Sequence, residues 1–188
     1  IVPRMDEWKT SVHQIRRVDV EDLLSRQAVR IESKAVAAEL AAGTVLVTGA
    51  AGSIGSEIVR KLSTLGVKRL VAFDSDESGT FQLQQELEGC LMKGQEFSFV
   101  VGSIRDAQKL RRVFSRHRPQ LVFHAAAYKH VPLMEAFPEE ALRTNVIGTL
   151  DLARMAIEHR VGKFVNISTD KAVKPCSAMG ASKRLAEM

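Results

Sequence analysis

A hydroxyl, a carboxylate and an amine stand together in Ser168-Thr-Asp-Lys171, and a second lysine, Lys183, follows twelve residues later. Such side chains can donate and accept protons, so the group suits acid/base chemistry. The residues follow an apolar run, and the carboxyl ends of parallel strands are where ligands bind in α/β proteins. Alternatively, Asp170 and Lys171 are ordinary charges of a surface loop near a turn at Pro175. The pattern alone leaves both interpretations open.

A glycine-rich loop, Gly49-Ala-Ala-Gly52-Ser-Ile-Gly55, points to a second kind of chemistry. Glycine permits a tight turn and lets backbone N–H groups approach a pyrophosphate, while the following helix N-terminus adds a favourable dipole. The loop stands between a β-branched apolar run and an amphipathic stretch, which is the strand–turn–helix context that this spacing requires. The expected dinucleotide contacts in the loop are Gly49, Gly52, Ser53, Ile54 and Gly55.

Asp74 closes the second apolar run, nineteen residues after Gly55. A carboxylate at this position accepts hydrogen bonds from the ribose hydroxyls of NAD and repels the 2′-phosphate of NADP. No arginine adjoins Asp74 in the sequence, which favours NAD as the cofactor. In the alternative interpretation, Asp74 is only a helix N-cap and the glycines form a generic turn.

Small residues follow two later apolar runs, in Gly102-Ser-Ile104 and Ala125-Ala-Ala127. In a doubly wound sheet the adenine lies near the first of these segments, and the second lets a dinucleotide approach the backbone closely. The expected cofactor contacts here are Ser103, Ile104, Ala125, Ala126 and Ala127. Plain packing is the alternative explanation for the alanines.

Composition excludes several classes of protein. The 188 residues are 45% hydrophobic and 26% charged, which is typical of a globular protein that can bury a core. Cys90 and Cys176 lack metal or disulfide-scaffold spacing, and no apolar run matches a membrane span or a signal peptide. The net charge of +5 is scattered, and its densest part, Arg111–Arg118, fits the solvent face of a helix. We therefore expect a reducing compartment, no metal site and no nucleic-acid partner.

Five short apolar runs alternate with longer amphipathic stretches. The predicted strands lie at 44–48, 70–73, 97–101, 121–123 and 163–167, and the predicted helices at about 54–65, 79–91, 106–117 and 139–160, with another opening near 178. This alternation predicts βαβ units, and hence an α/β fold with a doubly wound parallel sheet of the NAD(P)-binding Rossmann type. The expected domains are a lead-in segment over 1–43, with an alanine-rich helix at 34–42, and an NAD-binding domain over 44–188.

Four motifs together resemble one family, the extended short-chain dehydrogenase/reductases of bacterial polysaccharide biosynthesis that act as UDP-N-acetylglucosamine 4,6-dehydratases in capsule or O-antigen formation. The motifs are Thr48-Gly-Ala-Ala-Gly-Ser-Ile-Gly-Ser56, His124–Glu135, Thr144-Asn-Val-Ile-Gly-Thr149, and Ser168–Pro175 with Met179–Arg184. The lead-in at 15–24 is similar to the segment that precedes the catalytic domain of the long, membrane-anchored members. Family members continue well beyond Lys183, so the resemblance implies a fragment, truncated after the fifth strand and inactive alone, without the sugar-binding part.

The resemblance implies an NAD-dependent lyase that oxidises C4 transiently, eliminates water across C5 and C6, and returns the hydride to C6. It implies that Thr169 hydrogen-bonds the C4 oxygen, that Lys183 holds the nicotinamide ribose, and that Asn145 steadies the site. Asp170 and Lys171 become the acid and base, with their roles unassigned; desolvation that raises the pKa of Asp170 would suit an acid at C6. Met179 occupies the position of the usual catalytic tyrosine, a replacement known in the long dehydratases.

Further expectations come from the same resemblance: a UDP-sugar substrate, a homo-oligomer, and a cytoplasmic location with a membrane tether in a preceding segment. Ser103 departs from the family, since many relatives have an aspartate there that faces the adenine. A nucleotide-sugar epimerase of the same fold and a non-catalytic NAD sensor are the alternative functions. The Asp170-Lys171 pair argues against a sensor, because a sensor needs no acid or base.

Overall fold

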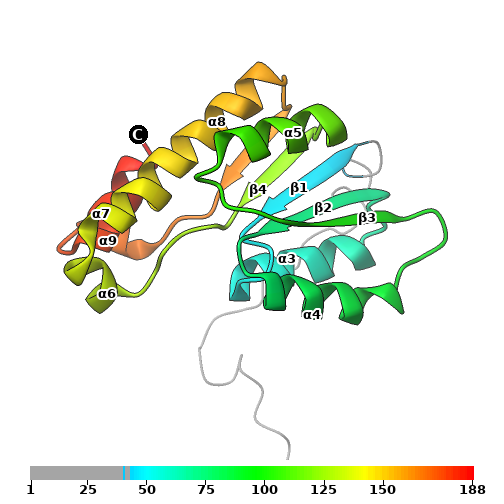
Figure 1. Cartoon of the computed structure of the whole chain (residues 1–188), viewed down its shortest axis with the longest axis horizontal. Helices are drawn as coiled ribbons and strands as arrows, with labels where there is room; N and C mark the ends of the chain where they lie inside the picture. The colour runs from blue at the N-terminus through cyan, green and yellow to red at the C-terminus, as the bar shows by residue number, and fades with distance from the viewer. Residues whose placement is uncertain (1–39, 41–42) are drawn as a thin grey trace, which may run out of the picture. The chain divides into compact units, whose positions relative to one another are not determined.

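A computed structural model describes Leu40 and residues 43–188 (Figure 1). The predicted lead-in segment and its alanine-rich helix lie outside the described residues, apart from Leu40 and Gly43. Within the described residues, no helix is both long enough and apolar enough to cross a membrane.

Five parallel strands form one sheet in the order β3-β2-β1-β4-β5 (Figure 1). The strands are β1 Thr44–Thr48, β2 Arg69–Asp74, β3 Glu96–Val101, β4 Leu121–His124 and β5 Lys163–Asn166. Each lies within two residues of its predicted range. From β1 the chain adds β2 and β3 on one side and then returns to add β4 and β5 on the other side. Ligands of such sheets bind where the strand order reverses, so the expected crevice opens beside the end of β1.

Helices cover both faces of the sheet, which confirms the doubly wound α/β fold (Figure 1). On one face lie α3 Ser53–Thr64 and α4 Glu77–Glu88, and on the other lie α5 Ala107–His117 and α8 Thr149–Glu158. Alternation along β1 sends Val45 and Val47 into the first core and Leu46 into the second. Every residue of β1 is therefore buried.

Two local predictions about helix faces had different outcomes. In α5, Leu110, Val113 and Phe114 are buried while Arg111 and Arg112 are exposed, which confirms a solvated basic face. In α3, the spacing of Ile54, Ile58, Leu62 and Leu65 at three to four residues predicts that Ile54 lies on the core face; this is wrong, since Ile54 is 57% exposed. The buried residues of α3 are Gly55, Val59, Leu62 and Ser63, so Ile54 lies beside the buried face rather than on it.

The helix predicted over 139–160 is not uniform. It consists of α7 Pro138–Ala141, a π-helical segment Leu142–Gly148, and α8. A short helix, α6 Val131–Ala136, was not predicted; it packs with α7 and with the last helix, α9 Ala178–Leu185. Because π-helical turns are rare and often occur at functional sites, the segment 142–148 marks a place to look for function.

Candidate functional site

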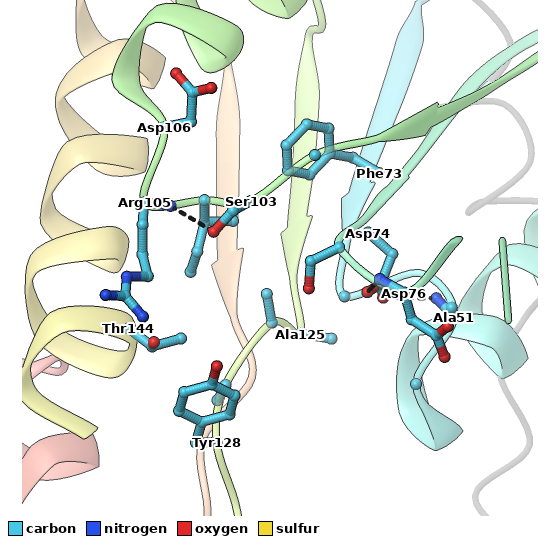
Figure 2. A pocket seen from close by; sticks show the side chains of 17 residues that line it. Ala51, Phe73, Asp74, Asp76, Ser103, Arg105, Asp106, Ala125, Tyr128 and Thr144 are labelled. Carbon is cyan, nitrogen blue, oxygen red and sulfur yellow. Dashed lines mark hydrogen bonds between the residues drawn. The ribbon is translucent and has the colours of Figure 1, made fainter. Parts of the chain in front are cut away.

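A cavity of about 590 Å³ opens where β1, β2, β3 and β4 end (Figure 2). Eight predicted cofactor contacts line it: Gly49, Gly52, Asp74, Ser103, Ile104, Ala125, Ala126 and Ala127. Lining residues that sequence reasoning missed include Ala51, Phe73, Ser75, Asp76, Arg105, Asp106, Tyr128 and Thr144. The other five predicted contacts do not line the cavity: Ser53, Ile54, Gly55, Asn145 and Lys183.

The glycine loop is fixed by close backbone packing. Gly49 has a φ of +70°, and a Cβ there would lie 2.5 Å from the backbone nitrogen of Ala126. A Cβ on Gly55 would overlap the carbonyl oxygen of Gly49, which also accepts a hydrogen bond from the Gly52 N–H at 3.1 Å. Gly55 therefore serves the close packing of α3 against the loop, one of the roles expected of glycine in such turns.

Backbone hydrogen bonds hold the carboxylate of Asp74 in place. Its Oδ2 accepts from the Ala51 N–H at 2.8 Å and its Oδ1 from the Asp76 N–H at 2.9 Å. A carboxylate has about four acceptor sites, so each oxygen retains capacity for a ligand hydroxyl. The N-cap of α4 is Asp76, whose Oδ1 accepts from the Gly79 N–H at 3.1 Å. Asp74 is therefore not merely a helix cap.

The opposite wall of the cavity joins the loop after β3 to the 138–148 helical segment. Ile104 is buried, and its Cδ1 would lie 2.9 Å from a Cβ on Gly148. The guanidinium of Arg105 donates to Glu140 Oε2 at 2.5 Å. Thr144 lies between Glu140 and Gly148 in the sequence and also lines the cavity (Figure 2). It is 8% exposed, and its hydroxyl has no partner among the described residues.

A buried hydrogen-bond network connects the ends of β1 and β4 to the π-helical segment. Thr149 Oγ1 donates to the carbonyl of Asn145 at 2.7 Å, so it accepts from His124 Nε2–H at 2.8 Å. The other ring nitrogen, Nδ1, then accepts from Thr48 Oγ1 at 2.7 Å. Burial, with a smaller contribution from the charge of Lys183, lowers the pKa of His124 to about 3. His124 is thus a neutral structural link with its proton on Nε2.

Asn145 ties the segment after β4 to α9. Its Oδ1 accepts from the Tyr128 N–H at 2.8 Å, and its Nδ2 donates to the Tyr128 carbonyl at 3.0 Å and to Ser182 Oγ at 2.9 Å. All of its amide groups are used in these contacts. Asn145 therefore has the geometry of a positioning residue rather than of a cavity contact.

The acid/base group lies after β5, outside the cavity. Thr169 caps a short 3₁₀ helix, Asp170–Ala172, and its hydroxyl donates to Asp170 Oδ1 at 3.0 Å. Asp170 and Lys171 are exposed. The hydrogen bond from Thr169 and the charge of Lys171 lower the pKa of Asp170. The condition that would suit Asp170 as an acid, a pKa raised by desolvation, is not met in the described structure, because the carboxylate lies in solvent.

Lys183 and Met179 are both buried in α9. Lys183 is 5% exposed and its Nζ donates to the Ile167 carbonyl at 2.7 Å, while burial lowers its pKa. Met179 is 4% exposed and forms a small apolar cluster with Met134 and Ala141. The side chain in the tyrosine position thus packs against α6 and α7.

The order of the strands and the glycine-loop cavity define a domain of the Rossmann class. A family model described as polysaccharide biosynthesis protein matches residues 45–188. The chain therefore belongs to the polysaccharide biosynthesis protein family. It is 44% identical over 177 residues to the capsular polysaccharide biosynthesis protein CapD of Staphylococcus aureus, covering 94% of this chain and 30% of CapD. It is 41% identical over 191 residues to the probable polysaccharide biosynthesis protein EpsC of Bacillus subtilis, covering 100% of this chain and 32% of EpsC.

The chain is also similar to solved structures that share its fold. Pen from Bacillus thuringiensis aligns with a TM-score of 0.72 at 31% identity, over 79% of this chain and 44% of Pen. A UDP-glucose 4-epimerase of Thermotoga maritima, solved with UDP-glucose, has a TM-score of 0.64 and 34% identity, over 77% and 49%. WbmG of Bordetella bronchiseptica, solved with NAD and UDP, has a TM-score of 0.63 and 27% identity, over 76% of this chain and 47% of WbmG. The chain spans about a third of the length of the two curated relatives named above.

Proposed function

We propose that this chain forms the NAD-binding part of an enzyme that modifies a UDP-sugar in polysaccharide biosynthesis. The observation that carries the proposal is the cavity at the reversal of strand order, with its glycine loop and preset Asp74 carboxylate. In this proposal the loop Gly49–Gly55 holds the pyrophosphate and Asp74 accepts from the adenosine ribose. The structure of WbmG with NAD and UDP supports this choice of cofactor.

The donor and acceptor groups of the cavity fit a dinucleotide. Thr144 offers a buried hydroxyl without a partner among the described residues, and a ligand would satisfy it. Asp74 and Asp76 place two carboxylates at the ribose end, where a 2′-phosphate would be repelled. The two carboxylates favour NAD over NADP, whereas the Thr144 hydroxyl would suit either dinucleotide.

Within this class we favour a UDP-N-acetylglucosamine 4,6-dehydratase, supported by the four motifs that resemble that family and by methionine at position 179. NAD, when bound, supplies reversible hydride transfer with C4 and C6 of the sugar. Thr169 would hydrogen-bond the C4 oxygen, and Lys183 would hold the nicotinamide ribose. Lys183 uses one of its donors on the Ile167 carbonyl and has two left.

The proton transfers can be balanced with Asp170 and Lys171 alone. Because the Thr169 hydroxyl already donates to Asp170, the C4 hydroxyl proton can pass through Thr169 to that carboxylate. Asp170 then returns this proton to the departing C6 hydroxyl, which leaves as water. Lys171 removes the C5 proton and gives it back after the hydride reaches C6. The net change is the loss of one water.

A nucleotide-sugar epimerase is the second candidate, favoured by the 34% identity to the Thermotoga maritima UDP-glucose 4-epimerase. Epimerisation retains the C6 hydroxyl, so the two candidates differ in product mass. The test adds the corresponding segment of CapD after Met188 and supplies UDP-N-acetylglucosamine and NAD. A 4-keto-6-deoxy product, identified by mass and NMR, supports the dehydratase; an isomer of the substrate supports the epimerase. If the protein does not bind NAD at all, the proposal is wrong.

A further inference from the structure

The base-binding end of the cavity follows from the strand register. β3 pairs with β2 so that Val101 lies beside Asp74. A ribose on Asp74 therefore directs its base toward the loop that leaves β3, Gly102–Asp106, which lines the cavity. Phe73 and Ile104, both buried, provide the apolar surface that a flat base needs at this end.

The carboxylates that line the cavity are not available to the base. Among the lining residues they are Asp74, Asp76 and Asp106. The first two lie at the ribose end. Asp106 is the N-cap of α5, where its Oδ1 accepts from the Lys109 N–H at 2.8 Å, and its carboxylate points away from Ser103 and Thr144 (Figure 2).

Hydroxyls and a guanidinium remain at the base end. Ser103 Oγ accepts from the Arg105 N–H at 3.2 Å, which leaves its O–H and one lone pair for a ligand. Thr144 has its hydroxyl free among the described residues, and a hydroxyl either donates or accepts. Arg105 can only donate, and its contact with Glu140 holds it in the cavity wall.

We propose that Ser103, Arg105 and Thr144 form a base subsite that binds a 6-oxopurine dinucleotide as tightly as the 6-aminopurine dinucleotide NAD. A 6-amino group needs a hydrogen-bond acceptor, whereas a 6-oxo group needs a donor. The hydroxyls of Ser103 and Thr144 can do either, and the guanidinium of Arg105 can only donate. A carboxylate at position 103 would accept from the amino group and repel the oxo group. The inference rests on the proposed function and extends it to the bases that the site admits.

The test titrates the protein by calorimetry with NAD and with nicotinamide hypoxanthine dinucleotide. We expect the two dissociation constants to agree within about threefold, because no charged acceptor selects the amino group. In Ser103→Asp the ratio of the two dissociation constants should shift by about tenfold or more in favour of NAD, since the new carboxylate forms a charge-assisted hydrogen bond with the 6-amino base only. Arg105→Leu should move the ratio the same way by a smaller factor. Arg112→Leu, on the exposed face of α5, is the matched control and should keep the wild-type ratio.

The outcomes separate this inference from the proposed function. A wild-type preference for NAD of more than about tenfold, the size expected for a selective hydrogen bond, overturns the inference and leaves the cofactor assignment standing. Failure to bind either dinucleotide contradicts the proposed function instead. The wild-type ratio does not depend on the folding of any variant, and thermal unfolding shows whether Ser103→Asp is folded.

Discussion

The cavity at β1–β4 and the segment after β5 lie at the same edge of one sheet, but the fold fixes their functional groups to very different degrees. Asp74 has each oxygen held by a backbone N–H, and the loop beside it allows no Cβ at Gly55. Asp170 is exposed, and its partners are its own neighbours Thr169 and Lys171. A site built from backbone is preorganised by the fold, whereas an acid/base pair in solvent lacks the burial that tunes a catalytic pKa.

The largest expected effect separates the two regions by function. In the protein extended with the CapD segment, Lys171→Met and Asp170→Asn should each lower turnover by about 10²- to 10⁴-fold, the usual cost of losing a positioned acid or base. NAD affinity should not change, because neither residue lines the cavity. Turnover, calorimetry and solvent deuterium exchange at C5 are the measurements. Lys174→Met, another exposed lysine, is the control; wild-type rates in both variants would make the segment structural.

The second prediction breaks the preorganised region. Gly55→Ala places a methyl group on the Gly49 carbonyl oxygen, so the loop must shift. We expect the free energy of unfolding to fall by about 2–4 kcal/mol, as for other steric overlaps in a packed backbone. NAD binding should be lost with it. Gly89→Ala is the matched control, since no atom lies within 4 Å of a Cβ there and its φ is −81°; equal effects of the two substitutions would contradict the packing argument.

The two regions also differ in how well sequence predicts them. Gly49, Gly52, Asp74 and the alanines after β4 line the cavity, because a backbone-built site depends on residue types at short spacing; that they contact the cofactor stays a prediction. Arg105 and Thr144 were missed. The contact of Arg105 with Glu140 spans 35 residues, and no local pattern encodes it.

The remaining errors have the same origin in tertiary contacts. The π-helical segment accompanies the hydrogen bonds of Thr149 and Asn145, which join it to β4 and to α9. The burial of Met179 against Met134 depends on α6, which was not predicted. The direction of the Asp170 pKa shift depends on exposure, which the sequence motif does not determine.

A third prediction concerns the buried link at the base of the preorganised region. His124 has a pKa of about 3 when folded, below its ordinary value of 6.5, so the unfolded state binds more protons between these values. The contribution of neutral, buried His124 to the free energy of unfolding is therefore complete above pH 6.5 and is lost as the pH falls toward 3. Between pH 6.5 and 4.5, His124→Gln should reduce the pH slope of the free energy of unfolding by up to about 1.4 kcal/mol per pH unit.

Denaturant titrations at several pH values measure this slope. His117→Gln is the control, because burial lowers the pKa of His117 too, but its ring is only partly buried and should change the slope less. An unchanged slope in His124→Gln would mean that His124 is protonated in the folded protein, and the assigned Nε2–H tautomer would be wrong.

The smallest expected effect sharpens the electrostatic difference within the cavity. Asp76→Asn removes one negative charge from the ribose end but preserves the helix cap, since asparagine caps as well as aspartate. Wild type should bind NAD more tightly than NADP, and the variant should reduce this preference by about two- to fivefold, the size of a partly screened charge interaction. Calorimetric titration with both dinucleotides measures the ratio, and Glu77→Gln, one residue further into α4 and outside the cavity lining, controls for a general change in charge. Because the Asp74 carboxylate remains in the variant, NAD should still bind more tightly. Tighter binding of NADP by wild type would show that the carboxylates do not face the 2′ position.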